Sequence, residues 1–173
     1  MTKLWCCKSC IIINLSLCCL AQNRDPGGWQ GARWGMTETE VLAAVPRAER
    51  NSGPDARKEN RGALALVTVP EIEVVEIPMQ VLFWFAGGKL QRVLIQPRRR
   101  EDDTVDDYCR IERALVQKYG RPWRNTGIKL RTSQWTFPAT VVTLELLQIP
   151  AIRWQSLSLV YAWRDPAAAP PLD

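Results

Sequence analysis

A run of alternating apolar segments between residues 63 and 96 constrains the fold of this chain more than any other feature. Four segments are rich in Val, Ile, Leu and aromatic residues and are bounded by Pro or Gly: 63–69, 72–77, 79–86 and 90–96. A period of two in such residues predicts β-strands. Gly87-Gly88 predicts a tight turn that makes the last two strands an antiparallel hairpin. The alternation slips phase at Val74-Val75, which predicts a β-bulge or an edge position there.

A short helix is predicted between Gly35 and Pro46, because both of its ends are marked in the sequence. Thr37 is placed as the N-cap, and Glu40 lies three residues further on, which is the spacing of a capping box. Pro46 ends the helix, since proline disfavours helical geometry in the residue before it and has no N–H to donate.

A second helix is predicted from Thr104 onwards. Its apolar residues recur at spacings that place them on one helical face: Tyr108, Ile111, Leu115 and Tyr119. Gly120, followed by Pro122, is the expected end of this helix. Further strands are predicted at 134–137, 141–147 and 157–163.

This order of elements predicts an α+β fold, in which an antiparallel sheet carries both helices on one face. The same order also fits one α-β-β-β unit used twice. The 173 residues, 46% of them hydrophobic, are enough for a single domain, which we place at 22–164. The Pro- and Ala-rich segment 165–173 is predicted to be a disordered tail.

The first 21 residues have the pattern of a signal peptide. Two lysines precede an apolar run of about ten residues, which is shorter than the ~20 that a membrane span needs, and Ala21 fits a cleavage site. The alternative is lipidation at Cys18, because Leu15-Ser16-Leu17-Cys18 resembles a lipobox with Leu17 where a small residue is expected. Cleavage after Ala21 removes every cysteine except Cys109, which is predicted to be a small hydrophobic residue of the core.

The composition argues against most enzyme classes. The chain has no histidine, so it lacks the commonest general base and the commonest zinc ligand. Two acidic patterns remain. Asp102-Asp103 with Asp106 resembles a magnesium-binding spacing, but acids at a helix start are already favoured by the helix dipole. The alternating acids Glu71, Glu73 and Glu76 are typical of a solvated strand face. We therefore expect no catalytic residue, no metal and no cofactor.

Two groups of residues are candidates for a partner surface. The first is the basic run Arg98-Arg99-Arg100, which suits an acidic partner or an anionic lipid headgroup. The second comprises Trp123 and Trp154, because exposed aromatic residues often mark binding sites. The formal charge is +5, and +3 once Lys3 and Lys8 are removed with the signal peptide. This excess is small and carries no recognition motif, so no nucleic-acid partner is expected.

Two motifs resemble those of the SmpA/OmlA family, small lipoproteins of the outer-membrane β-barrel assembly machine. They are Gly35-Met36-Thr37 with Val41 and Val45, and the later hairpin from Val81 to Ile95. Family members have Gly-x-Pro at the end of the first helix, where this chain has Pro46-Arg47-Ala48. The resemblance implies an exported α+β protein of the Gram-negative envelope with a binding role.

The sequence therefore favours a non-enzymatic exported protein, a binding or accessory module of the periplasm or of the inner leaflet of the outer membrane. Its expected partner is a protein, with membrane association as a further expectation. The alternative is a secreted inhibitor, effector or immunity-type protein, and a small hydrolase is the third hypothesis.

Overall fold

The computed structural model of the chain describes residues 24–57, 60, 62–98 and 104–165. These residues form an eight-stranded antiparallel sheet, a separate two-stranded sheet and two α-helices, which agrees with the predicted α+β class. The predicted signal peptide 1–21 lies outside the described residues. So do Cys18, Arg99, Arg100 and all of the predicted tail except Asp165.

The elements, in chain order, are β1 (Gly28–Trp29), β2 (Ala32–Arg33), α1 (Glu38–Ala44), β3 (Glu49–Arg50), the 3-10 helix η1 (Pro54–Arg57), β4 (Leu64–Val74), β5 (Ile77–Ala86), β6 (Lys89–Pro97), α2 (Thr104–Tyr119), β7 (Trp123–Thr126), β8 (Leu130–Thr136), β9 (Thr140–Ile149), the 3-10 helix η2 (Pro150–Ile152) and β10 (Trp154–Trp163).

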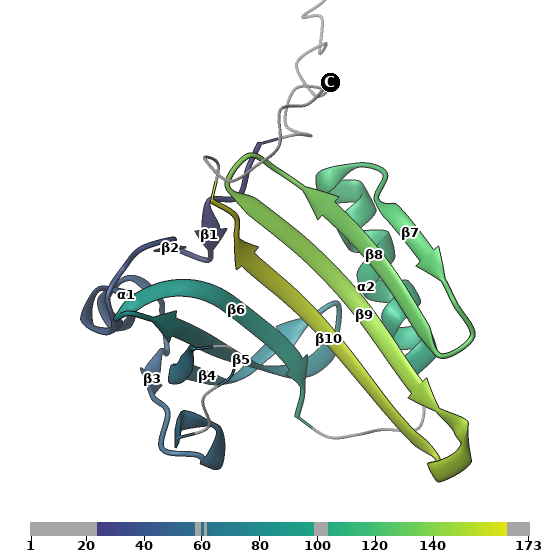
Figure 1. Cartoon of the computed structure of the whole chain (residues 1–173), viewed down its shortest axis with the longest axis horizontal. Helices are drawn as coiled ribbons and strands as arrows, with labels where there is room; N and C mark the ends of the chain where they lie inside the picture. The colour runs from purple at the N-terminus through teal and green to yellow at the C-terminus, as the bar shows by residue number, and fades with distance from the viewer. Residues whose placement is uncertain (1–23, 58–59, 61, 99–103, 166–173) are drawn as a thin grey trace, which may run out of the picture.

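Each α-helix is followed by four strands that form an antiparallel meander. The strands of the large sheet lie in the order β3-β4-β5-β6-β10-β9-β8-β7, so the last strand of each meander pairs with the last strand of the other. Figure 1 shows the two meanders side by side, with α2 behind β8 and β9. The seam between them is the β6–β10 pair, in which Leu159 lies opposite Ile95.

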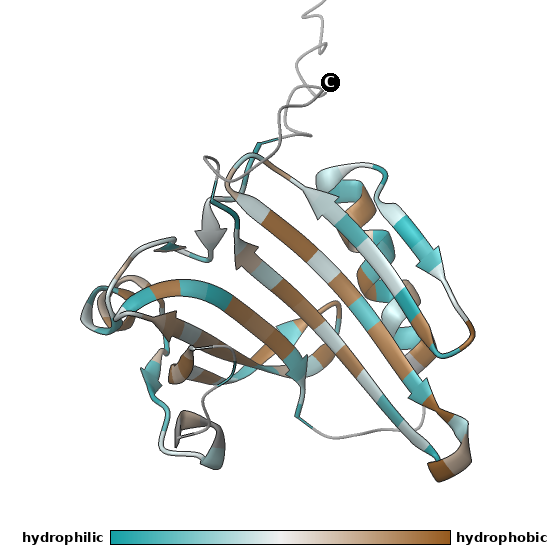
Figure 2. Cartoon of the chain, in the orientation of Figure 1, coloured by the Kyte–Doolittle hydropathy of each residue, from teal (hydrophilic) through white to brown (hydrophobic). Residues whose placement is uncertain are grey.

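The main hydrophobic core lies against one face of this sheet. Alternate residues of the central strands point into it, as the alternating colours along β9 and β10 show in Figure 2. Val41 of α1 and Ile111 of α2 are almost completely buried in the same core cluster as Phe83 and Leu144. Residues from both helices and both meanders therefore share one core.

The ends of both helices agree with the sequence predictions. The Thr37 N–H donates to the Glu40 carboxylate at 2.7 Å, and the Glu40 N–H donates to the Thr37 hydroxyl at 3.4 Å, which completes the capping box. Helix α1 has only seven residues, too few to be stable alone. At the end of α2, Gly120 has φ +79° and its N–H donates to the Val116 carbonyl.

The separate strand predicted at 72–77 is wrong. Strand β4 continues to Val74, a turn follows at Val75 and Glu76, and Ile77 begins β5. Both turn residues have positive φ, +45° and +66°, a conformation that β-branched residues rarely adopt. The two irregularities in the β4–β5 ladder fall earlier, between Ala65 and Val67 and between Val69 and Ile72. Val74 and Val75 favour a strand by their local preference, but the tertiary structure places a turn at Val75 and Glu76.

Several elements were missed altogether. Strand β7 follows α2 directly, so a fourth strand joins the three that were predicted in the second half. All four residues of β7 are exposed, and such a strand has no alternation to detect. The segment 47–62, between the first predicted helix and the first predicted strand, contains β3 and η1. Strand β3 is only two residues long and pairs with Thr68 and Val67 of β4.

Thr37→Ala should reduce the free energy of unfolding by about 1 kcal/mol, because it removes the side chain that caps α1. Urea denaturation followed by circular dichroism measures this change. Thr39→Ala is the matched control, since Thr39 is exposed inside the same helix and alanine is the better helix former. Equal losses in both variants would contradict a capping role for Thr37.

Candidate binding surface

Trp123 and Trp154, the two tryptophans predicted at a partner surface, lie on the same face of the sheet, the one opposite the core. Trp123 is 62% exposed on the edge strand β7, and Trp154 is half-buried at the start of β10. Trp123 is opposite Gln134 and Trp154 is opposite Ile149. They are about 20 Å apart along the strand direction and three strands apart across the sheet, at ~3.4 Å per residue. The two tryptophans therefore lie on the same face of the sheet but do not contact each other.

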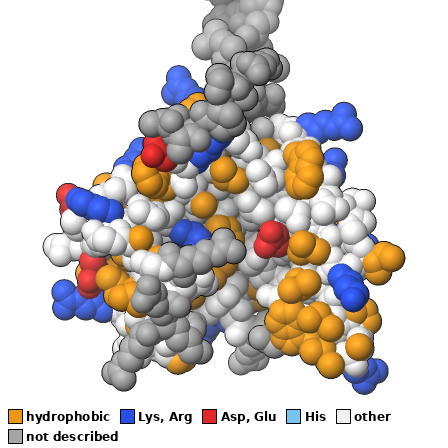
Figure 3. Space-filling model, viewed as in Figure 1, with side chains coloured by type: hydrophobic (Ala, Val, Ile, Leu, Met, Phe, Trp, Pro, Cys, Tyr) orange, Lys and Arg blue, Asp and Glu red, His pale blue; other side chains and the backbone are white. Residues whose placement is uncertain are grey.

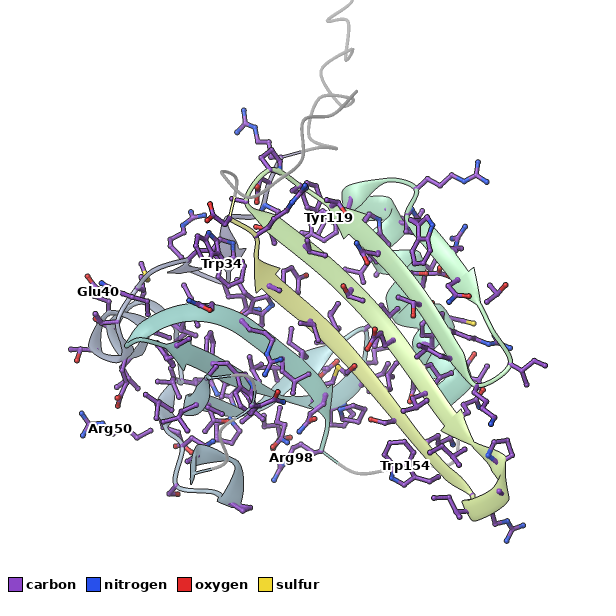
Figure 4. All side chains as sticks on the ribbon, viewed as in Figure 1. Trp34, Glu40, Arg50, Arg98, Tyr119 and Trp154 are labelled. Carbon is purple, nitrogen blue, oxygen red and sulfur yellow. The ribbon has the colours of Figure 1, made fainter. Side chains whose placement is uncertain are left out.

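Arg98 follows β6 and forms an ion pair with Glu71 of β4. Both side chains are about half exposed, so the pair contributes little to stability. Figure 4 shows Arg98 and Trp154 toward the same end of the molecule. Arg99 and Arg100 are outside the described residues, so only the first residue of the predicted basic run can be placed.

We define the open face as the side of β6, β8, β9 and β10 that points away from the core. Alternation assigns the residues: Leu144 and Leu146 of β9 are buried in the core, whereas Glu145 between them points to the open face. Its members are mostly small or polar: Arg92, Leu94, Gln96, Leu130, Thr132, Gln134, Thr136, Val141, Thr143, Glu145, Leu147, Ile149, Trp154, Ser156, Ser158, Val160 and Ala162.

Glu145 is the only carboxylate on the open face as defined above. It is half-buried, and its neighbours across the ladders are Thr132 on β8 and Ser158 on β10. Among the described residues it forms no ion pair. A half-buried carboxylate flanked by small hydroxyl side chains can accept a charge-assisted hydrogen bond from a Lys or Arg of a partner.

The open face ends at β6, and beyond it a second small cluster of buried residues lies on the same side of β4 and β5. Ala63, Ala65, Leu82 and Trp84 are buried together on this side. The Arg92 guanidinium lies 4.6 Å from the ring centroid of Trp84, a cation–π contact at the boundary between the covered part and the open part.

A strap formed by residues 24–34 crosses one end of the sheet. The Asp25 carboxylate accepts hydrogen bonds from the N–H groups of Gly27 and Ala139 and from the Thr140 hydroxyl. The Trp34 indole N–H donates to the same hydroxyl at 2.8 Å. Burial by itself raises the pKa of Asp25. The hydrogen bonds from Thr140, Ala139 and Gly27 together lower the pKa by a larger amount, so the net shift is downward. Asp25 thus joins the strap to the turn between β8 and β9.

A cavity of about 440 Å³ lies beside the strap. Its lining includes three cationic side chains, Arg24, Arg33 and Lys118, together with Asp25 and Tyr161. Three cations against one carboxylate give the cavity a positive character suited to an anion. Burial, together with the neighbouring Tyr119 hydroxyl, raises the pKa of Tyr161, which therefore stays protonated.

The three acids considered for catalysis, Glu71, Glu73 and Glu76, line a surface groove of about 230 Å³ together with Arg47. Glu71 pairs with Arg98, and Glu76 pairs with Arg110 at 2.8 Å. Exposed carboxylates that are paired with arginines are typical of a solvated surface.

A more buried acid is Glu112 on α2, which accepts hydrogen bonds from Ser133 and Arg124. Burial raises its pKa, the hydrogen bonds from Ser133 and Arg124 lower it, and the net shift is downward. Ser133 is completely buried and also contacts the Tyr108 hydroxyl at 2.9 Å. This network ties α2 to β7 and β8.

The described residues contain no group of three His, Cys, Asp or Glu side chains that could hold a metal ion. Cys109 is a free thiol, half-buried, and packs against the core as the sequence suggested. In the part of the chain that the structure describes, neither helix is long and apolar enough to cross a membrane.

Comparison of the chain with protein-family models, with curated proteins and with solved structures gave no significant match. The resemblance to the SmpA/OmlA family therefore remains a hypothesis drawn from the residues quoted above.

Asp25→Asn should lower the free energy of unfolding at neutral pH by about 1–3 kcal/mol, because the amide leaves one buried donor without an acceptor. A folded-state pKa below the ordinary value stabilises the fold above about pH 4, and this stabilisation is lost as the pH falls through the folded-state value. The wild type should lose stability in that acidic range more steeply than the variant.

Urea denaturation at several pH values measures both effects. Glu73→Gln is the control, since Glu73 is exposed on β4 and should change neither quantity appreciably. If Asp25→Asn unfolds with the wild-type pH dependence, Asp25 does not hold the strap as described.

Proposed function

We propose that this protein is a non-enzymatic, exported binding module of the cell envelope, and that it binds a protein partner through the open face. The observation that carries the proposal is Glu145, a half-buried carboxylate without an ion-pair partner among the described residues. It stands at the centre of an uncovered sheet face. Burying such a group against a partner is favourable only if the partner supplies a cation. The partner is therefore a protein that presents Lys or Arg to Glu145.

The fold supports a binding role because no helix of the described residues covers the open face over the second meander. We propose that α1 and α2 cover the same face and that the two halves are copies of one unit, with four strands after the helix. The shared core cluster and the repeated order of elements support this. In such an arrangement the stability comes from one face, and the other is available for recognition.

The export part of the proposal rests on the sequence of residues 1–21 and on the family resemblance. The location follows from these: the periplasm, or the inner leaflet of the outer membrane, of a Gram-negative bacterium. The alternative, a secreted inhibitor, effector or immunity-type protein, would use the same open face to block an enzyme. Retention in the envelope distinguishes the first hypothesis from release into the medium.

A photo-crosslinking residue at Gln134, on the open face, should give one discrete adduct with a partner protein in cells that produce the chain at its native level. The matched control is the same replacement at Gln117, which is exposed on α2. Glu145→Lys should reduce the Gln134 adduct roughly tenfold or more, since it places like charges against each other, and Glu145→Gln should reduce it less.

Glu49→Lys is the control for charge reversal, because Glu49 is exposed on β3 at the other side of the molecule. Adducts of equal yield from Gln134 and Gln117, or an adduct unchanged by Glu145→Lys, would sink the assignment of the open face.

The natively produced protein should be found in the soluble periplasmic fraction with the intact mass of a chain that begins at Gln22. A species in the membrane fraction that begins at Cys18 and carries acyl groups would establish the lipoprotein alternative. A full-length chain that retains Met1 in the cytosol would contradict export.

A further inference from the structure

Two turns lie next to each other at the end of the sheet that is farthest from the strap. They are the β7–β8 turn, residues 127–129, and the β9–β10 turn, residues 150–153. Leu130 is opposite Leu147, and the Gln148 N–H donates to the Lys129 carbonyl at 2.8 Å. Because these pairings hold the two turns side by side, their side chains form one continuous surface.

This surface, which we call the apolar tip, consists of Ile128, Leu130, Leu147, Ile149, Ile152 and Trp154. Ile128 is 94% exposed and Ile152 is 68% exposed, the two highest values among the large hydrophobic residues described. Figure 3 shows hydrophobic side chains gathered over the β9–β10 turn at the lower right. Contiguous exposed apolar residues of this kind are uncommon on monomeric proteins and mark contact with another apolar phase.

The charged residues of the segments 127–131 and 147–154 are all cations. Lys129, Arg131 and Arg153 flank the exposed isoleucines, and all three are exposed. The two segments 127–131 and 147–154 contain no Asp or Glu. An apolar centre with a cationic rim is complementary to a surface that is apolar inside and anionic outside.

We propose that the apolar tip docks on the surface of an anionic phospholipid bilayer. Ile128 and Ile152 enter the boundary between headgroups and acyl chains, and Trp154 lies at the level where indole rings are preferred. The three cations contact lipid phosphates. Each cation contributes electrostatic attraction to binding, and added salt weakens this attraction by screening. A protein partner would need an apolar pocket ringed by acids. The groove that Ile72 and Pro78 line together with Glu71, Glu73 and Glu76 has this composition, so a second copy of this chain is the rival occupant that the experiment below distinguishes from a bilayer.

The apolar tip lies at the opposite end of the sheet from the N-terminal strap, so the bilayer contact is distinct from any attachment through the N-terminus. Asp25 holds the strap against Ala139 and Thr140, at the opposite end of β9 from Ile149. The two ends are about 30 Å apart at ~3.4 Å per residue. Figure 4 shows Trp34 and Trp154 at these opposite ends. Leu130, Leu147, Ile149 and Trp154 belong both to the tip and to the open face, whereas Ile128 and Ile152, which enter the bilayer, lie in the turns outside the open face.

Flotation of the natively processed protein with vesicles tests this contact. The protein should float with vesicles of phosphatidylcholine mixed with phosphatidylserine, and much less with phosphatidylcholine alone. Added salt should release it. Ile152→Asp and Ile128→Asp should each reduce the bound fraction roughly tenfold or more, because a carboxylate replaces the inserted side chain.

Val75→Asp is the matched control, since Val75 is an exposed hydrophobic residue at the β4–β5 turn and has positive φ. It should float like the wild type. Circular dichroism should show that all three variants are folded, because the replaced side chains are exposed.

Lys129→Gln combined with Arg153→Gln should remove the preference for the anionic vesicles and leave the fold unchanged. The proposal is overturned if Ile152→Asp and Val75→Asp float alike, or if the wild type does not distinguish the two kinds of vesicle. Concentration-dependent dimers that Ile152→Asp abolishes, without flotation of the wild type, would assign the tip to a second copy of the chain.

Discussion

The pairing of β6 with β10 is the interaction on which the rest of the structure depends. It joins two meanders, each of four strands, into one sheet through the register Leu159–Ile95 to Ala162–Arg92. Val93 and Ile95 on one side of the seam and Leu157 and Leu159 on the other are buried in the same core cluster. The core therefore continues across the seam from one meander to the other, and the open face continues across it from Leu94 to Val160.

The strap makes the same connection at one end of the sheet. Trp29 packs edge-to-face on Phe83 of the first meander, with ring centroids 5.8 Å apart, while Asp25 binds the β8–β9 turn of the second. Gly28 permits this tight hairpin, because a Cβ there would lie 1.9 Å from the Ala32 carbonyl oxygen. The strap covers one end of the core, and the turns of the apolar tip lie at the other end of the sheet.

Local signals were the part of the fold that the sequence predicted well. The capping box of Thr37 and Glu40 and the Gly87-Gly88 hairpin need only residues that are close in the chain, and both are present. The turn at Val75 and the exposed strand β7 contradict local preference, so tertiary structure alone determines them. For the site, Trp123 and Trp154 were predicted, but Glu145 was not. An acid in an alternating strand indicates only a solvated face, and which face stays uncovered depends on where the helices and the segment after α1 pack.

The two proposed surfaces attract charges of opposite sign, which makes them compatible in one small domain. Glu145 lies four residues before Ile149, about 14 Å along β9 at ~3.4 Å per residue. That is more than the Debye length of ~8 Å at physiological ionic strength, so a bilayer at the tip would repel the carboxylate only weakly. A partner that presents Lys or Arg to Glu145 would itself be drawn to the same anionic surface. Docking of the tip would therefore orient the strands of the open face away from the bilayer surface. It would also hold the open face close to the surface at which such a partner is already concentrated.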